Sequence, residues 1–199
     1  MTKRAYTLAE VLITLGIIGV VAALTISVLS HNIQKYVLKN QFKKTYNTLS
    51  NAINKVYTDL EYRPACTYGY GHGGLTECEM FTKQFISNLN VIKKCTKAKE
   101  QECIKYIRAL YDESVGSVGL RQSYIDNKNY TYLLKDGSMI MLYDSGIVPI
   151  YIIDVNGPKG PNKWGYDQYY FQINNYKLSC LYNTIDTGGT KCSDIIKTP

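Results

Sequence analysis

The sequence has few of the residues that most catalytic and metal sites require. It contains two histidines, His31 and His72, and neither stands in a recognisable catalytic or ligand motif. No Cys-x-x-Cys pair occurs, which argues against a zinc site. The glycine-rich stretch 68–74 is followed by no Gly-Lys-Ser/Thr, so it lacks the phosphate-loop pattern. With no Ser-His-Asp or Cys-His set, we expect the chain not to be an enzyme.

Charge is missing from one long stretch near the N-terminus. No charged residue occurs from Val11 to Leu29, and most of these 19 positions are Val, Ile, Leu, Ala or Gly. At about 1.5 Å rise per residue this run spans roughly 28 Å, close to the thickness of a bilayer core. A buried helix of a soluble protein is usually shorter and apolar on one side only. The pattern therefore predicts a membrane-spanning helix.

Six cysteines follow this apolar run, and none precedes it or lies within it. An even number on one side of a membrane segment is typical of disulfides formed in an oxidising compartment. Six cysteines allow 15 pairings, and short loops favour neighbours along the chain. The favoured pairs are Cys66–Cys78, Cys95–Cys103 and Cys180–Cys192. The formal net charge of +7 is explained most simply by a solubilising surface, while contact with nucleic acid or anionic surfaces stays open.

The order of residues at the N-terminus is not that of a secretory signal peptide. Such a peptide has a small-residue cleavage site after its apolar stretch, whereas here the small Ala5 precedes the stretch and follows Lys3 and Arg4. Glu10 lies at the edge of the apolar run. A carboxylate is costly there unless it has a partner, so its presence indicates a function.

The stretch from Ala5 to Gly19, AYTLAEVLITLGIIG, resembles the cleavage and methylation motif of type IV prepilins and type II secretion pseudopilins. The resemblance covers residues 3–29. It implies that a prepilin peptidase cuts between Ala5 and Tyr6 on the cytoplasmic face and that the new amine of Tyr6 is methylated. Glu10 is then the fifth residue of the mature chain, where the family keeps its acid.

The sequence departs from this motif in two respects. The family usually has Gly before the cut and Phe after it, where this chain has Ala5 and Tyr6. Many members also carry a proline in the second half of the apolar segment, and residues 25–28 contain none. Small and aromatic character is kept at the cut, so we still expect cleavage, followed by a helix that stays straighter than in most members.

The resemblance also implies partners and a location. A charged amine and a carboxylate buried in an apolar filament core must each find a partner, so Glu10 of one subunit is expected to pair with the Tyr6 amine of its neighbour. The implied partners are other pilin or pseudopilin subunits, the peptidase and methyltransferase, and the assembly platform with its ATPase. The implied location is the bacterial inner membrane, single-pass, with the N-terminus cytoplasmic and the head periplasmic or, in the filament, extracellular.

Four regions are expected along the chain: a leader (1–5), a membrane and filament-core helix (6–29), an amphipathic continuation of that helix (30–62) and a globular head (63–199). No Gly or Pro interrupts residues 30–62, and the helix is expected to end before Arg63-Pro64. Apolar residues recur there at steps of three to five, a stripe that predicts packing against the head. They are Ile33, Val37, Phe42, Tyr46, Leu49, Ile53, Val56 and Leu60.

The head is expected to be α+β. Residues 66–78 read as a loop, 79–89 and 100–113 as short helices, and 116–119 as a bend. Strands are predicted over 130–135 and 138–143, joined by an Asp-Gly turn, and over 147–153 and 169–173. A long helix followed by an antiparallel sheet gives a pilin-like α+β fold, with the helix packed on a small sheet.

A loop rich in glycine and asparagine separates the last two predicted strands. Asp154, Asn156, Asn162 and Asp167 offer oxygen ligands of the kind that calcium prefers, although the spacing is not that of an EF-hand. A hydrogen-bonded turn is the alternative. The loop also resembles the calcium-binding loop of major pseudopilins, which implies calcium as a possible cofactor, with an affinity of about 10⁻⁴–10⁻³ M typical of extracellular modules.

Two functions follow from these observations. The first is a structural subunit of a filament that either pushes secreted substrates outward or forms a surface pilus. The second is a minor pilin with a dedicated binding role in DNA uptake or adhesion, since 19 tyrosines and the positive net charge allow base stacking and phosphate contacts.

Overall fold

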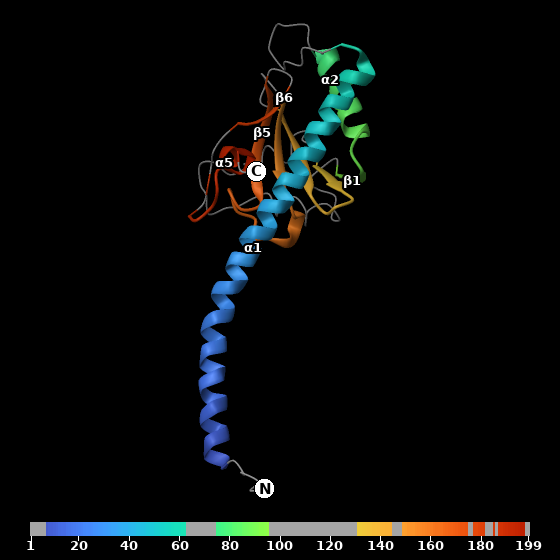
Figure 1. Ribbon diagram of the computed structural model, residues 1–199. Coiled ribbons are helices and arrows are strands. Elements are labelled where there is room, and N and C mark those ends of the chain that lie inside the picture. Colours follow the sequence, from blue (N-terminus) through green and yellow to red (C-terminus); the bar gives the residue numbers. More distant parts are fainter. Residues whose placement is uncertain are drawn as a thin grey trace. The chain divides into compact units, whose positions relative to one another are not determined.

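The structure is a computed structural model that describes residues 7–62, 75–95, 131–144, 149–174, 177–181, 185 and 187–197. The helix predicted over 100–113 and the bend over 116–119 lie outside these residues and stay predictions. The chain comprises two compact units, Met1–Val37 and Leu38–Pro199. Helix α1 (Leu8–Leu60) is continuous through both of them, as Figure 1 shows in blue and cyan.

The first unit contains the N-terminal part of α1. Its large apolar side chains are exposed, from Leu8 to Leu29 and beyond. Neither Gly16 nor Gly19 interrupts the helix, and nothing from elsewhere in the described chain approaches either glycine within 4 Å. This helix is long and apolar enough to span a membrane, as the sequence predicts.

The second unit contains the C-terminal part of α1, which is amphipathic. Four residues of the predicted stripe are buried in the core: Phe42, Leu49, Ile53 and Val56. Two more, Tyr46 and Leu60, are partly buried against it. The core also includes Leu38 and Ala52 of the same helix. The predicted stripe is therefore confirmed from Phe42 onward. The prediction is wrong for the first two residues of the stripe, because the side chains of Ile33 and Val37 are exposed. Both residues belong to the first unit, so they precede the part of the helix that meets the sheet.

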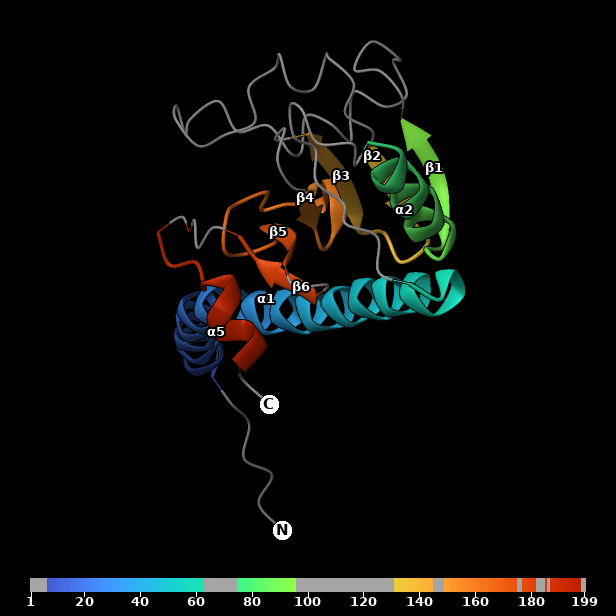
Figure 2. The ribbon, with the colours of Figure 1, turned by 90° about the horizontal axis from the view of Figure 1, so that it is seen from above.

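Six antiparallel strands form one sheet in the order β1-β2-β3-β4-β5-β6, each strand pairing with the next along the chain. Figure 2 shows this sheet beside the cyan half of α1. The predicted α+β class is confirmed. The strands are β1 (Val91–Cys95), β2 (Thr131–Leu134), β3 (Met139–Asp144), β4 (Pro149–Asp154), β5 (Gln168–Asn174) and β6 (Lys177–Cys180).

Aromatic side chains fill the space between the sheet and its helices. On α1, the Phe42 ring meets Tyr169 edge-on at a centroid distance of 4.4 Å and lies 5.7 Å from Phe171, both on β5. On α2 (Leu75–Ser87), Phe85 meets Tyr151 of β4 edge-on at 5.3 Å. Edge-on and offset contacts of this kind add to the stabilisation from area burial, so these rings help to hold β4 and β5 against the helices.

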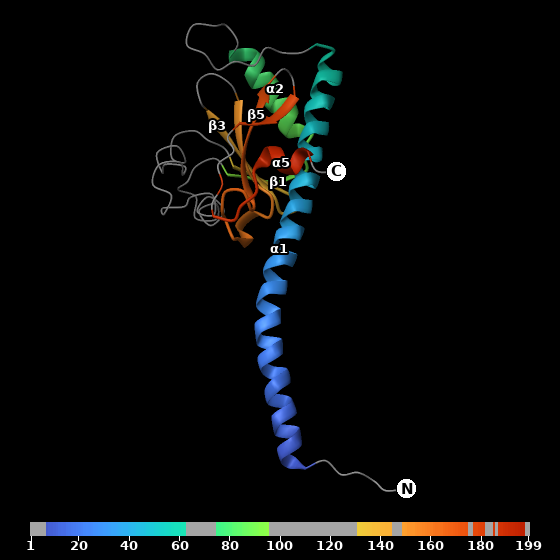
Figure 3. The ribbon, with the colours of Figure 1, turned by 60° about the vertical axis from the view of Figure 1, so that its left-hand side comes forward.

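Several predicted boundaries are corrected by the structure. Helix α2 begins at Leu75, so residues 75–78 are helical and not part of the predicted loop. Gly74 is the last helix-breaking residue before them, and the cysteine at position 78 does not prevent a helix. Strands β1 and β6 and the short helix α5 (Cys192–Lys197), shown in red in Figure 3, were not predicted. Each is only four to six residues long, so its pairing partners and a disulfide define it more than local pattern.

Replacing Phe42 by alanine tests the core. Phe42 is 1% exposed, so Phe42→Ala removes a buried ring and its contacts with β5, and it should lower the free energy of unfolding by about 3–5 kcal/mol. The measurement is urea denaturation of the full-length protein in detergent micelles, followed by the fluorescence of Trp164. Ile92→Ala, on a side chain that is exposed on β1, is the control and should change stability by about 0.5 kcal/mol or less. Equal losses in the two variants would contradict this packing.

Candidate functional site

The first described turn of α1 holds Glu10 in a capping box. The backbone N–H and the hydroxyl of Thr7 both donate to Oε2 of Glu10, at 2.8 and 2.9 Å, and the backbone N–H of Glu10 donates to Oγ1 of Thr7 at 3.3 Å. This reciprocal arrangement satisfies backbone donors that the start of a helix leaves unpaired. Glu10 is thus held at the helix end by Thr7, the residue that directly follows Tyr6 in the sequence. Ala5 and Tyr6 themselves lie outside the described residues.

The first unit exposes an extensive apolar surface around and after Glu10. Every large apolar side chain described between Leu8 and Leu29 is exposed. Full burial of one such side chain stabilises by roughly 1.5–3 kcal/mol, so a dozen of them in water would be strongly unfavourable. This part of α1 therefore requires an apolar environment that the described chain itself does not supply.

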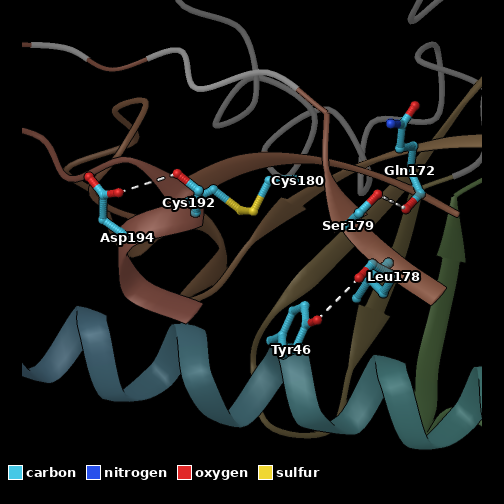
Figure 4. Close-up of a disulfide and its surroundings, with 8 residues drawn as sticks. Tyr46, Gln172, Leu178, Ser179, Cys180, Cys192 and Asp194 are labelled. Atoms are coloured by element: carbon cyan, nitrogen blue, oxygen red, sulfur yellow. Dashed lines mark hydrogen bonds between the residues drawn. A yellow bond between two sulfur atoms is a disulfide. The ribbon is translucent and has the colours of Figure 1, made fainter. Parts of the chain in front are cut away.

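One disulfide lies within the described residues. Cys180, at the end of β6, is bonded to Cys192, at the start of α5, as the sequence predicts. Figure 4 shows this bond joining the strand to the helix. Cys95 is also disulfide-bonded. Cys66, Cys103 and the side chain of Cys78 lie outside the described part of the structure, so the pairs Cys66–Cys78 and Cys95–Cys103 stay predictions.

The loop that carries the four predicted calcium ligands connects β4 to β5. Asp154 is the last residue of β4, a short 3₁₀ turn η1 (Gly157–Lys159) follows, and Asp167 immediately precedes β5. The register of the two strands pairs Asp154 with Gln168, and the N–H of Val155 donates to the carbonyl oxygen of Asp167 at 2.9 Å. Two carboxylates that are thirteen positions apart in the sequence are thereby brought to the same end of the hairpin.

Both carboxylates are buried, each at 0% exposure, and both accept hydrogen bonds from the loop. For Asp154, the N–H of Asn156 donates to Oδ1 at 3.2 Å and Nε2 of Gln168 donates to Oδ2 at 3.3 Å. For Asp167, the backbone N–H groups of Asn162 and Lys163 donate at 2.8 and 2.7 Å. The loop backbone therefore closes around the carboxylates and leaves them without access to solvent.

The other two predicted ligands present buried amide oxygens. Oδ1 of Asn156 and Oδ1 of Asn162 are buried, and neither accepts a hydrogen bond from the described residues. Nδ2 of Asn156 donates to the carbonyl oxygen of Gly160 at 2.7 Å, which fixes the orientation of that amide. A buried acceptor without a donor costs roughly 1–3 kcal/mol, so two in one loop indicate a missing positive partner.

The electrostatics of the loop also favour a cation. Burial, and then the charge of Asp167, raise the pKa of Asp154 to about 8. Burial also raises the pKa of Asp167, against the hydrogen bonds from Lys163 and Asn162 that lower it. Burial hinders the ionisation of both carboxyls, and a cation that neutralises both would stabilise them.

The donors in this loop suit a hard cation. They are carboxylate and amide oxygens, which calcium prefers, whereas zinc and copper prefer sulfur and imidazole ligands. Within the described residues, no three His, Cys, Asp or Glu side chains gather in one place. The two carboxylates would therefore need the two amide oxygens and backbone carbonyls to complete the six to eight ligands that calcium takes. The residues present fit that requirement.

Sequence reasoning did not identify the residues that support this loop. Gln168 binds Asp154, and Gly157 lies so close to the 136–137 turn that a Cβ there would clash with the carbonyl oxygen of Gly137. Trp164 is buried and stacks on Tyr170 with ring centroids 4.3 Å apart. The glycine-rich composition was the only available signal, because the other contacts join residues from separate segments.

Comparison of the chain with protein-family models, with curated proteins and with solved structures finds no match.

Replacing Asp154 by asparagine tests the electrostatics of the metal-free loop. The ionised carboxylate is disfavoured in the folded state, so the wild-type protein in chelator should lose stability as pH rises from about 4 to about 8. Asp154→Asn removes the ionisation and the repulsion with Asp167, so it should raise the melting temperature at pH 7 and flatten this pH dependence. The measurement is thermal denaturation of the full-length protein in detergent with chelator.

The control for this experiment is Asp59→Asn, on an exposed carboxyl of α1, which should leave the melting temperature within about one degree of wild type. If Asp154→Asn lowered the melting temperature in chelator at pH 7, the carboxylate would be a favourable part of the metal-free fold. The electrostatic description of the loop would then be wrong.

Proposed function

We propose that this chain is a non-enzymatic structural subunit, a pilin or pseudopilin, of a type IV pilus-like or type II secretion filament. The observation that carries the proposal is the first part of α1. Its apolar side chains are exposed along its length, and Glu10 is the one charged residue between Leu8 and Leu29. The α+β head with a disulfide near its C-terminus supports the same proposal.

Two environments can bury this apolar surface. A lipid bilayer surrounds the helix while the subunit is stored, and the helices of neighbouring subunits surround it in the filament. The apolar side chains are buried in both, so they distinguish poorly between the two states. Glu10 does distinguish them, because a carboxylate at the edge of a membrane helix is costly without a partner and a filament can offer it a cationic one.

The geometry at the helix start supports the amine of Tyr6 as that partner. Thr7 holds the Glu10 carboxylate against the first turn, adjacent to the residue that the predicted cut would make the N-terminus. In a filament, the Glu10 carboxylate of an arriving subunit pairs with the Tyr6 amine of a neighbour and sets the axial register. This requires cleavage after Ala5 by a prepilin peptidase, N-methylation of Tyr6, and insertion in the inner membrane with the N-terminus cytoplasmic.

Substitution of Glu10 tests whether its charge is needed for assembly. Glu10→Gln keeps an oxygen that can accept from Thr7, so it preserves the capping box and removes only the charge. We expect Glu10→Gln and Glu10→Ala each to reduce filaments sheared from cells that carry the native assembly genes to below about a tenth of wild type. Thr14→Ala, a change in the same exposed segment, should assemble normally and serves as the control. Wild-type filament yield from Glu10→Gln would refute the charge-pair mechanism.

We also propose that the 154–167 loop of the head binds calcium. The supporting observation is the convergence of two buried carboxylates with two buried amide oxygens that lack donors. When bound, calcium supplies a divalent charge that neutralises Asp154 and Asp167. The chain's part is to hold those carboxylates in place through the N–H groups of Asn156, Asn162 and Lys163. Calcium would thereby stabilise the end of the β4–β5 hairpin.

A calcium titration tests this site directly. With a dissociation constant of about 10⁻⁴–10⁻³ M, calcium at ~5 mM should stabilise the folded head by roughly 1–2 kcal/mol, a rise of a few degrees in melting temperature. The measurement compares full-length protein in calcium, in magnesium and in chelator. Asp167→Asn should abolish the rise, and magnesium should give a smaller one. An unchanged melting temperature in wild type would exclude calcium binding here and leave the filament proposal intact.

A further inference from the structure

The chain's last described segment packs against the calcium-binding loop. We call residues 187–197 the C-terminal strap. The hydroxyl of Tyr166 donates to the carbonyl oxygen of Thr187 at 2.9 Å, and the backbone N–H of Thr190 donates to the carbonyl oxygen of Gly165 at 2.7 Å. Gly165 and Tyr166 lie in the loop between Asn162 and Asp167. The strap therefore binds the part of the loop that joins two of the four candidate ligands.

Two glycines allow this close contact. Gly165 and Gly188 both have positive φ, near +80°, a conformation that favours glycine. A Cβ on Gly165 would stand 2.8 Å from Cγ2 of Ile185, and a Cβ on Gly188 would stand 2.6 Å from the hydroxyl oxygen of Tyr166. The loop therefore lies in close contact with Ile185 and with residues 187–190, which leaves little freedom for one to move without the other.

The strap is anchored at its far end. Cys192 is bonded to Cys180, and Ile195 is buried in the hydrophobic core of the second unit. Cys180 in turn pairs across the sheet with Phe171 of β5, the strand that begins directly after Asp167. Figure 4 shows the disulfide above α1, with Tyr46 of that helix reaching Leu178 of β6, where its hydroxyl donates to the carbonyl oxygen at 3.1 Å. Loop, strap and β6 therefore form one closed ring of contacts.

We propose that the C-terminal strap is a positioning element of the calcium site, and that the Cys180–Cys192 disulfide raises the calcium affinity of the loop by holding the strap against it. This rests on the proposed calcium binding. A strap already held in place orders residues 165–166 before calcium arrives, so the metal need not supply the free energy to order them. Coupling between two sites is reciprocal, so calcium should also stabilise the strap and protect the disulfide.

The affinity test uses the full-length protein in detergent. Trp164 is the only tryptophan of the chain and lies in the loop, so its fluorescence and the terbium luminescence it sensitises report on this site. Calcium dissociation constants are measured by displacement of terbium. The double variant Cys180→Ser with Cys192→Ser should bind calcium about 5-fold or more weakly than wild type. Circular dichroism checks that this variant is folded.

A second variant leaves the disulfide intact. Tyr166→Phe removes only the hydroxyl that donates to Thr187, and it should weaken calcium binding by about 2- to 10-fold. The matched control is Lys191→Ala, an exposed side chain of the same strap, which should bind calcium as wild type does. In chelator, the melting temperature of Tyr166→Phe should differ from that of wild type by less than it does in calcium. A purely structural role of the hydroxyl would lower the melting temperature equally in both conditions.

The reciprocal effect is measured as an equilibrium, in mixtures of reduced and oxidised dithiothreitol. Dithiothreitol reduces the Cys180–Cys192 bond by adding two electrons and two protons to its sulfurs, which gives two thiols, while the dithiol closes to its cyclic disulfide. Peptide mapping after alkylation gives the reduced fraction of this bond separately from the other cysteines. Saturating calcium should lower the equilibrium constant for the reduction by about the factor that separates the calcium dissociation constants of wild type and the double serine variant.

The outcomes distinguish the two proposals. If wild-type protein binds no calcium, the calcium function fails and the positioning role fails with it. If wild type binds calcium and both strap variants bind it equally well, calcium binding stands and the positioning role is overturned. If the double serine variant does not fold, Tyr166→Phe decides the question, and wild-type affinity in that variant rejects the proposal.

Discussion

The continuity of helix α1 is the constraint on which the rest of the structure depends. Within a helix, every interior backbone N–H and C=O finds its partner locally, so the same element can lie in an apolar medium and in a protein core. The side chains then decide the environment of each part. From Val11 to Leu29 they carry no charge and are mostly apolar, and from Leu38 to Leu60 they are apolar along one stripe, which the sheet covers. No Gly or Pro separates these two parts between Ser30 and Tyr62.

A second constraint is electrostatic and lies in the β4–β5 loop of the head. The β4–β5 register brings Asp154 and Asp167 together away from solvent, where burial disfavours the ionised form of each and the charge of Asp167 adds to the cost for Asp154. A bound cation would lower this cost. The buried amide oxygens of Asn156 and Asn162, which accept no hydrogen bond from the described residues, would suit the same cation. The C-terminal strap closes over this loop, so the stability of the loop and the integrity of one disulfide are linked through a few backbone contacts.

Sequence predicted those features that depend on neighbouring residues. The 8–60 helix follows from an unbroken apolar run and stripe, and the β2–β3 hairpin follows from its Asp136-Gly137 turn. Strands β1 and β6 were missed because these short segments, which contain Lys93 and Lys177, show no clear alternation of apolar and polar residues. Pairing with β2 and β5 defines the two strands. The four candidate ligands of the loop were proposed from composition, and the structure brings them to one end of the β4–β5 hairpin. Gln168 and the strap residues that hold the loop were missed, because those contacts join separate strands and segments.

The most direct test of the account is the structure of the filament, determined by electron cryo-microscopy from cells that express the native gene with its assembly machinery. We predict that residues 8–29 of each subunit form the apolar core, with the head outside and the Glu10 carboxylate within hydrogen-bonding distance of a neighbour's methylated Tyr6 amine. A filament with this helical segment at its periphery, or a chain that remains monomeric in the membrane when all assembly components are present, would contradict it.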